Sequence, residues 1–357
     1  MNPFWKAETT VSREEVIWCY RTLLGREPES EEVIAANAKS KDVKSLVESF
    51  VSSPEFVAKS AVAKVLPPIS VEVARGHIQP ADLIGPKQNL ALGMAEFEAG
   101  VLEVNSTPHM ITLETSSRCN LRCVMCPHAI NAVNRPKHMD SGLLAGLERF
   151  IRQSGNIQLH GIGEPLASPA FWDSLNFIPD DCESSINTNF TVLDDKRLKK
   201  LVASQLKFIN VSLDAARPET YQKIRGFAFD EVVGNIRRFV AARAASGKKF
   251  PLLCMNMTLM RTNIEEVLEF INMAADLGAD GIYFWHLNRW PAEEMQRYMV
   301  ERDGWMFDYK KEGLWNFPEL SDDYLHKAEA LALERGISLC LDQNKQVYFM
   351  GEEASHG

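Results

Sequence analysis

From His109 onward, short runs rich in β-branched residues alternate with longer amphipathic stretches. Six runs predict strands and five stretches predict helices. Consecutive βα units of this kind predict a parallel sheet that right-handed crossovers would curl into a full or partial barrel. We therefore expect the α/β class, as a partial (β/α)6 parallel barrel. The predicted strands lie near 110–115, 156–161, 184–189, 207–213, 252–259 and 280–286, and the helices near 140–153, 169–176, 194–204, 217–244 with a break at Gly226, and 263–277.

The segments that flank this core have a different character. Ser12 and Glu15 form a capping box before the apolar-periodic stretch 16–24, and Ser53-Pro54 predicts a further helix start. No strand alternation occurs there, so we expect a small N-terminal all-helical domain. The expected units are a helical accessory domain over 1–64, a proline-containing linker packing on the barrel over 65–108, the core over 109–290, and an aromatic segment with a helix near 321–335 and the strand Ile337–Leu341 within 291–357.

The composition excludes several classes of function. Lys and Arg number 39 against 48 Asp and Glu, which gives a net charge of −9, and no basic block suggests a nucleic-acid partner. The first ten residues are polar and contain Pro3, unlike a signal peptide, and no apolar run reaches the roughly 18 residues of a spanning helix. We therefore expect no membrane attachment. The seven cysteines are odd in number and do not suit a disulfide framework, so we also expect a reduced, cytoplasmic protein.

Polar residues occupy one parity of the predicted strands and apolar residues the other. Since helices must cover the apolar parity, the polar parity should face a hydrated chamber. Strands exposed to solvent on one face would give the same pattern. The polar positions are Thr112 and Glu114, Gln158 and His160, Ser185, Asn187 and Asn189, Asn210, Ser212 and Asp214, and Cys254, Asn256 and Thr258.

Three cysteines crowd into eight residues just after the first predicted strand: Cys119, Cys123 and Cys126. Active sites of α/β barrels gather at this end of the strands. Three thiolates in one loop can converge on one metal centre, and an iron–sulfur cluster held by three ligands leaves a position open for a small molecule. A zinc site with His128 as the fourth ligand is the alternative, with His128 otherwise an ordinary loop residue.

The spacing C-x₃-C-x₂-C after a first strand resembles the radical S-adenosylmethionine (radical SAM) superfamily, and the similarity covers about residues 109–290. Three further segments in the matching order support it. Gly161-Ile162-Gly163-Glu164-Pro165 resembles the family's Gly-Gly-Glu-Pro segment, and Ile186-Asn187-Thr188-Asn189 resembles its Thr-Asn-Gly turn. The segments 211–215 and 221–226 resemble the fourth-strand region, with Ser212 and an arginine, Arg225, that meets the cofactor carboxylate.

The resemblance implies a [4Fe–4S] cluster on Cys119, Cys123 and Cys126 that chelates the amino and carboxylate groups of S-adenosylmethionine. An external electron donor, flavodoxin- or ferredoxin-like, would supply the electron that releases a 5′-deoxyadenosyl radical, which takes a hydrogen atom from the substrate. The residues implied at the cofactor are Met125, Gly161, Gly163, Glu164, Asn187, Asn189, Ser212 and Arg225. Each also has an ordinary structural explanation, such as a turn glycine, a helix-start acid or a helix-end arginine.

The chain departs from the family pattern in three places. Met125 stands where many members carry an aromatic residue, and Phe190 replaces the glycine of the third-strand turn. Many relatives with the segment 221–226 carry a cysteine-rich SPASM or twitch extension, whereas only Cys340 lies beyond Cys254 here. We therefore expect no auxiliary cluster from this chain.

The sequence gives less information about the substrate. The polar parity suits a small polar substrate, and 20–28 with 53–56 resemble an uncharacterised helical domain of glycan-related proteins, which favours a carbohydrate or nucleotide sugar. A peptide substrate for a maturase or epimerase is the alternative, and a non-catalytic zinc-bearing barrel is a remote one. The lone chamber-facing thiol, Cys254, is a candidate hydrogen-atom donor or else a small buried apolar residue. Glu114, His160 and Asp214 are candidate acid/base groups by position.

Overall fold

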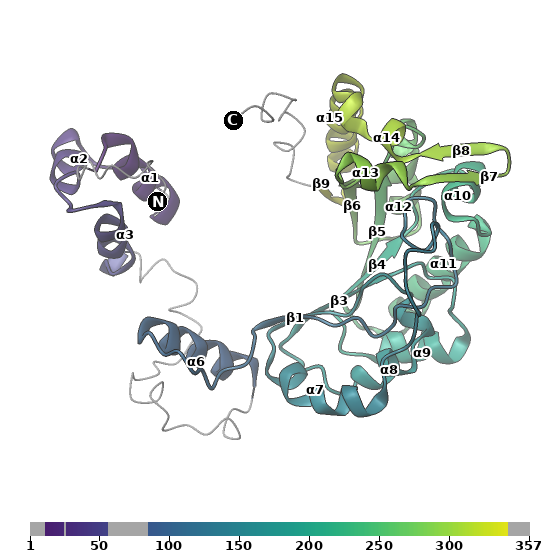
Figure 1. Cartoon of the computed structure of the whole chain (residues 1–357), viewed down its shortest axis with the longest axis horizontal. Helices are drawn as coiled ribbons and strands as arrows, with labels where there is room; N and C mark the ends of the chain where they lie inside the picture. Colours follow the sequence, from purple (N-terminus) through teal and green to yellow (C-terminus); the bar gives the residue numbers. More distant parts are fainter. Residues whose placement is uncertain (1–10, 25, 56–84, 342–357) are drawn as a thin grey trace.

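The computed structural model describes residues 11–24, 26–55 and 85–341, and its centre is a curved sheet of seven strands in the order β1-β2-β3-β4-β5-β6-β9 (Figure 1). All neighbouring strands in this sheet are parallel. Within the described residues the sheet does not close, since β1 and β9 are its edges. The strands are β1 Met110–Thr112, β2 Asn156–Gln158, β3 Glu183–Thr188, β4 Phe208–Ser212, β5 Leu252–Leu259, β6 Gly281–His286 and β9 Ser338–Leu341.

Helices connect the strands and lie along one side of the sheet (Figure 1). The apolar parity of the strands, including Ile157, Ile186, Ile209 and Leu253, is fully buried beneath them. The polar parity faces the concave side, where Asn210 and Ser212 of β4 are half-buried and Cys254 and Asn256 of β5 are buried. The helices are α7 Ser141–Gln153, α8 Pro169–Ser174, α9 Asp195–Ala203, α10 Pro218–Arg225, α11 Phe229–Ser246, α12 Val267–Asp276 and α15 Pro318–Arg335, with the short 3-10 turns η3 Pro165–Ala167 and η4 Ile264–Glu266.

Local sequence signals fix several helix ends in this core. The Asp194 side chain accepts the amide of Arg197 at 2.8 Å and caps α9. Gly226 ends α10 with φ of 70°, a left-handed conformation that glycine adopts at little cost. This glycine is the predicted break, which separates α10 from α11. The predicted partial barrel is therefore confirmed, and β9 adds a seventh strand to it.

The N-terminal residues form helices, as expected. They are α1 Arg13–Leu23, α2 Glu31–Asn37 and α3 Val43–Val51, which share a small core around Val16, Leu46 and Phe50. The predicted capping box is present at Ser12 and Glu15. Pro54 and Glu55 are helical, as Ser53-Pro54 predicts, and the rest of that predicted helix falls outside the described residues.

Two parts of the core's surroundings differ from the predictions. The segment interpreted as a linker contains a helix, α6 Pro86–Glu98, which proline at its first position starts. The aromatic segment after β6 is ordered as α13 Ala292–Gln296, an antiparallel hairpin of β7 Met299–Arg302 and β8 Trp305–Asp308, α14 Tyr309–Glu312 and the 3-10 turn η5 Leu314–Asn316.

The hairpin had a recognisable signal. Asp303 and Gly304 join its strands with φ of 50° and 76°, so both turn residues have positive φ, as a two-residue type I′ turn requires. An Asp-Gly pair between two apolar runs predicts such a turn. The hairpin was nevertheless not predicted from the sequence, because its two strands are short. In the described parts of the chain, every helix is too short or too polar to cross a lipid bilayer.

Candidate functional site

The three clustered cysteines lie in the loop between β1 and α7, which we call the cysteine loop and define as residues 119–126. Cys123 is buried, whereas Cys119 and Cys126 are partly exposed, and all three are free thiols. A tight turn brings the Cys126 amide to the Cys123 carbonyl at 2.9 Å. Besides burial, the thiols of Cys119 and Cys123 both help to raise the pKa of Cys126, so the three thiols lie near one another in this loop.

The pKa values of the three thiols bear on the two metal centres expected from the sequence. Burial raises the pKa of all three thiols, that of Cys126 to about 11, so each thiolate needs a nearby positive charge such as iron supplies. Across the described residues, no three His, Cys, Asp or Glu side chains are arranged to hold a single metal ion. Thiolates ligate both zinc and iron–sulfur clusters, so the donor set of the cysteine loop is chemically compatible with either centre.

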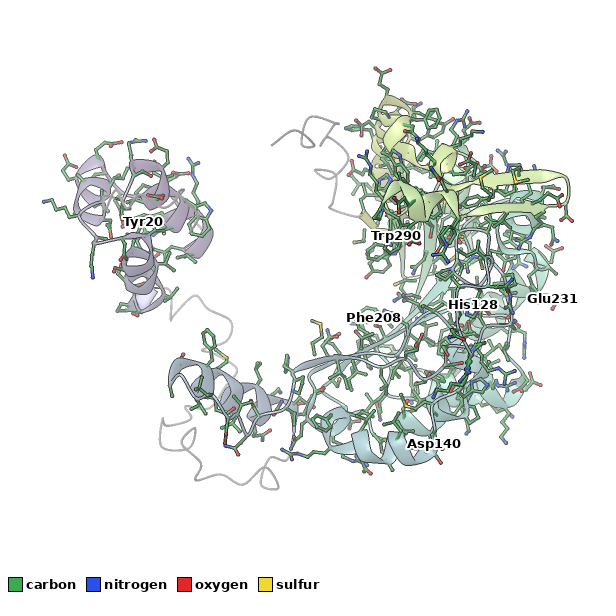
Figure 2. The ribbon with its side chains drawn as sticks, viewed as in Figure 1. Tyr20, His128, Asp140, Phe208, Glu231 and Trp290 are labelled. Atoms are coloured by element: carbon green, nitrogen blue, oxygen red, sulfur yellow. The ribbon has the colours of Figure 1, made fainter. Side chains whose placement is uncertain are left out.

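His128, the fourth ligand of that alternative, lies in the loop between β1 and α7 (Figure 2). It is buried, its Nε2 has no hydrogen-bond partner among the described residues, and burial lowers its pKa. A neutral imidazole with an unpartnered nitrogen is compatible both with a loop residue next to the site and with the fourth ligand of the zinc alternative.

The segment after β2 is tied to the cysteine loop by its backbone. The Glu164 amide donates to the Arg118 carbonyl at 2.8 Å. A Cβ atom on Gly163 would lie 2.1 Å from the Ser116 carbonyl oxygen, so only glycine fits there. At Gly161 the Cβ would instead meet the Glu114 side chain, whose carboxylate accepts the Ile162 amide at 2.7 Å.

Glu164 links this segment to the end of β3. Its buried carboxylate accepts the Leu166 amide at 2.9 Å, the Thr188 hydroxyl at 2.6 Å and the Asn189 amide at 2.7 Å. Burial raises the pKa of Glu164, and these donors oppose that shift. The side chain therefore positions the β3 turn and does not project into open space.

Asn189 extends the network from the β3 turn to the cysteine loop. Its Nδ2 donates to Asn120 Oδ1 at 3.0 Å and lies 3.7 Å from Cys119 Sγ. Phe190, at the family's glycine position, adopts φ of 57° and is fully buried. The turn is thus kept although its glycine is absent.

A buried ion pair joins the end of β4 to the end of α10. Arg225 Nε lies 2.6 Å from Asp214 Oδ2, and Arg225 Nη1 lies 3.5 Å from Cys123 Sγ. Burial disfavours the charge on Arg225, but Asp214 outweighs that cost and raises the arginine pKa further. Asp214 Oδ1 also accepts the Thr258 amide at 2.7 Å. The carboxylate is therefore engaged on both oxygens and holds the arginine beside the cysteine loop.

The polar parity forms rows across the concave face. The register places Asn187, Asn210, Cys254 and Gly281 in one row, and Asn210 donates to Asn187 at 2.9 Å. The next row holds Ser212, Asn256 and Tyr283.

Several polar atoms of this face have no partner among the described residues: His160 Nδ1, Asn210 Oδ1 and Asn256 Oδ1. Cys254 is buried, and burial raises its pKa to about 11. The face therefore carries buried polar atoms without a partner and one neutral, buried thiol.

A cavity of about 340 Å³ lies between the cysteine loop and the ends of β5 and β6. Met125, Thr258, Trp285, Trp290 and Tyr298 are among the residues that line it. Trp290 follows β6 (Figure 2), and Trp285 stacks on Tyr283 with a centroid separation of 5.8 Å. Trp285 was not identified as a site residue from the sequence, whereas Trp290 belongs to the aromatic segment 290–315 that the sequence offered as a place for a peptide or as ordinary packing.

The structure reveals one more unpredicted polar residue, Asn263. It is fully buried, and its Nδ2 donates to the carbonyls of Asp214 and Thr258 at 2.8 Å each. It braces the backbone that carries the ion pair. No short motif marks it, because its partners come from two separate strand ends.

Comparison with known proteins finds matches to the core of this chain. Residues 113–274 match the model of the radical SAM superfamily. The AdoMet-dependent heme synthase of Methanosarcina barkeri is 27% identical over 190 residues, which cover 50% of each chain. A probable GTP 3′,8-cyclase of Methanosarcina mazei is 32% identical over 174 residues, covering 45% of this chain and 50% of that protein. The chain therefore spans about half the length of the curated relatives it matches.

Solved structures share the fold at low sequence identity. Streptococcus suis SuiB bound to S-adenosylmethionine superposes with a TM-score of 0.52 at 15% identity, covering 89% of this chain and 67% of that chain. SuiB bound to its precursor peptide SuiA gives a TM-score of 0.53 at 16% identity, covering 83% of this chain and 62% of that chain.

Proposed function

Because residues 113–274 form a radical SAM domain, we propose that Cys119, Cys123 and Cys126 of this chain hold the family's [4Fe–4S] cluster beside S-adenosylmethionine. When bound, the cluster supplies the single electron that cleaves the sulfonium carbon–sulfur bond and so starts hydrogen-atom abstraction from the substrate. The observation that carries the proposal is the convergence of four family segments, at 119–126, 161–165, 186–189 and 211–225, on one strand-end site.

The chain's own residues would bind and orient the cofactor. Gly163 lets the backbone approach closely, Glu164 fixes the β3 turn, and Asn189 reaches from that turn to the cysteine loop. Arg225, held by Asp214, provides a buried guanidinium for the cofactor carboxylate. These contacts favour Asp214 as a positioning group over the acid/base role expected from its sequence position.

The aromatic cavity suits the flat part of S-adenosylmethionine. Met125 and Tyr298 lie on its cysteine-loop side and Trp285 on its sheet side. Planar heteroaromatic rings bind well between such side chains. We assign the adenine ring to this cavity, with Asn187 and Ser212 on the adjoining strand ends near the sugar.

The substrate would bind on the concave face. Unpartnered polar atoms of His160, Asn210 and Asn256 favour a polar substrate with several hydrogen-bond donors. A carbohydrate or nucleotide sugar rests on these polar groups and on the resemblance of residues 20–28 and 53–56 to a domain of glycan-related proteins.

A peptide is the second candidate. A PqqA peptide cyclase of Streptomyces rochei and a mycofactocin maturase of Mycobacterium tuberculosis match this chain, and the SuiB fold has been observed with its precursor peptide.

Cys254 would return a hydrogen atom to the substrate radical. Its sulfur–hydrogen bond would break as a substrate carbon–hydrogen bond forms. The external electron donor, with a proton from solvent, would then reduce the sulfur radical. The raised pKa keeps this thiol protonated at neutral pH. Of the other acid/base candidates, Glu114 is engaged by the Ile162 amide, whereas His160 Nδ1 has no partner in the described residues.

The decisive experiment is anaerobic reconstitution with iron and sulfide, followed by reduction with S-adenosylmethionine present. We expect 5′-deoxyadenosine from the intact chain and none from Cys123→Ala. Cys182→Ala is the matched control, because Cys182 is also buried but lies at the start of β3, away from the loop. A colourless protein that retains zinc would refute the proposal. Cys254→Ala that still forms product normally would refute the role of that thiol alone.

A further inference from the structure

The side chain of Arg302, at the end of β7, lies against both the cysteine loop and the end of α10. Its Nη1 donates to the carbonyls of Lys223 at 3.1 Å and Ile224 at 2.9 Å. Its Nη2 donates to the carbonyl of Arg122, which lies between Cys119 and Cys123. One guanidinium thus joins three backbone oxygens from two segments that are distant in sequence.

The end of α10 is the meeting point of these contacts. The Ile224 carbonyl also accepts the amide of Val124 in the cysteine loop at 3.0 Å. The last carbonyls of a helix lack partners within the helix, and a cation there is favoured by the helix dipole. The next residue is Arg225, whose guanidinium lies beside Cys123. A shift of this helix end would therefore move both groups.

The chain leaves space for the guanidinium. Gly226, directly after Arg225, would place a Cβ 2.9 Å from Arg302 Cζ. A side chain at this position would press on the guanidinium. Glycine thus serves both as the left-handed end of α10 and as the wall of the space that Arg302 fills.

The hairpin that carries Arg302 rests on a hydrophobic core separate from the main one. Phe307 and Tyr309 are buried in it, and they share it with Val124 of the cysteine loop and Ile224 of α10. The arginine is therefore presented from a packed support.

From this geometry we infer that Arg302 is a positioning residue, which clamps the cysteine loop to α10 and keeps Cys123 and Arg225 aligned. The inference deepens the proposed function and rests on it for its consequence at the cluster. It assigns the hairpin of β7 and β8 to the construction of the active site.

The first test follows hydrogen exchange in the full chain before any iron is added. In Arg302→Gln, peptides covering residues 119–127 should exchange about tenfold faster, because the charge-assisted bonds that hold the loop are lost. Exchange in β5 should stay unchanged, which shows that the fold is intact. Arg297→Gln is the matched control, since Arg297 is an exposed arginine of the same segment paired with Glu294. Unchanged exchange over 119–127 in Arg302→Gln would overturn the clamp.

The second test uses the reconstituted protein. Arg302→Gln and Arg302→Lys should release iron to a chelator several times faster than the wild type. Both should also show a weaker S-adenosylmethionine-induced change in the paramagnetic resonance spectrum of the reduced cluster. Lysine keeps the charge but lacks the planar fork that spans several carbonyls, so it should not restore either property. Full rescue by lysine would overturn the bridging role. If the wild type takes up no cluster, the proposed function fails, while the exchange result still decides the clamp.

Discussion

The buried pair of Asp214 and Arg225 allows a direct test of how this site is held together. We consider Asp214→Asn, because asparagine has nearly the same shape and tolerates the φ of 62° at this position. The variant can keep its oxygen on the Thr258 amide. Its NH₂ group then faces the Arg225 guanidinium, and because both groups are hydrogen-bond donors they cannot bond to each other.

The expected cost follows from burial. The side chains of Asp214 and Arg225 are 1% and 10% exposed, so water cannot replace the lost carboxylate. Removing one partner of such a pair costs about 3–5 kcal/mol of the free energy of unfolding. With a urea dependence of about 3 kcal/mol per molar, the unfolding midpoint should fall by at least about 1 M.

The assay is urea unfolding at pH 7.5, followed by far-ultraviolet circular dichroism. Glu269→Gln is the matched control, since its pair with Arg217 is 50% exposed on each side and should cost less than about 1 kcal/mol. The double variant Asp214→Asn with Arg225→Met removes both charges and should recover part of the loss. A midpoint for Asp214→Asn equal to that of Glu269→Gln would refute the reasoning.

Three further predictions concern neighbouring parts of the site. Gly163→Ala should lower the free energy of unfolding by about 2–4 kcal/mol, measured by urea titration, because its methyl group would meet the Ser116 carbonyl; an unchanged midpoint would contradict the close approach. Glu164→Gln should cost about 2–4 kcal/mol in the same assay, because one buried donor, such as the Asn189 amide, loses its acceptor; Glu148→Gln on the exposed face of α7 is its control. Burial lowers the folded-state pKa of His128 from 6.5, so its contribution to stability is present above pH 6.5 and lost as the pH falls through the lowered value. His128→Gln should therefore flatten the decline in melting temperature between pH 7 and 5, and an unchanged decline would show that other groups cause it.

The strand and helix pattern of the core could be predicted from sequence because local periodicity and the packing faces agree. The strand predicted over 252–259 matches β5, and Gly226 separates two helices as expected. The place of the cysteine loop after β1 likewise matches the prediction, and metal binding by its three cysteines stays a prediction.

The remaining parts of the site depend on contacts that no local pattern encodes. Arg302 lies 180 residues from Arg122 along the chain, and its role appears only when the hairpin folds onto α10. Asp214 resembled a proton-transfer group by strand parity, but its partner Arg225 commits it to an ion pair. Glu164 resembled a ligand-facing acid, whereas three internal donors occupy its carboxylate. Sequence thus predicts which segments meet, and the structure shows which side chains they leave available.

Phe190 has a mechanical consequence for the third-strand turn. A bulky residue with φ of 57° is strained, and burial of its ring against Phe239, with centroids 5.9 Å apart, offsets that strain. The Phe190 carbonyl also accepts a hydrogen bond from the side-chain Nδ2 of Asn235 in α11 at 2.9 Å. The backbone that carries Asn189 is therefore anchored to a long helix on the outer side of the sheet. Because Asn189 in turn donates to Asn120 of the cysteine loop, a continuous chain of contacts joins α11 to that loop through the strained turn.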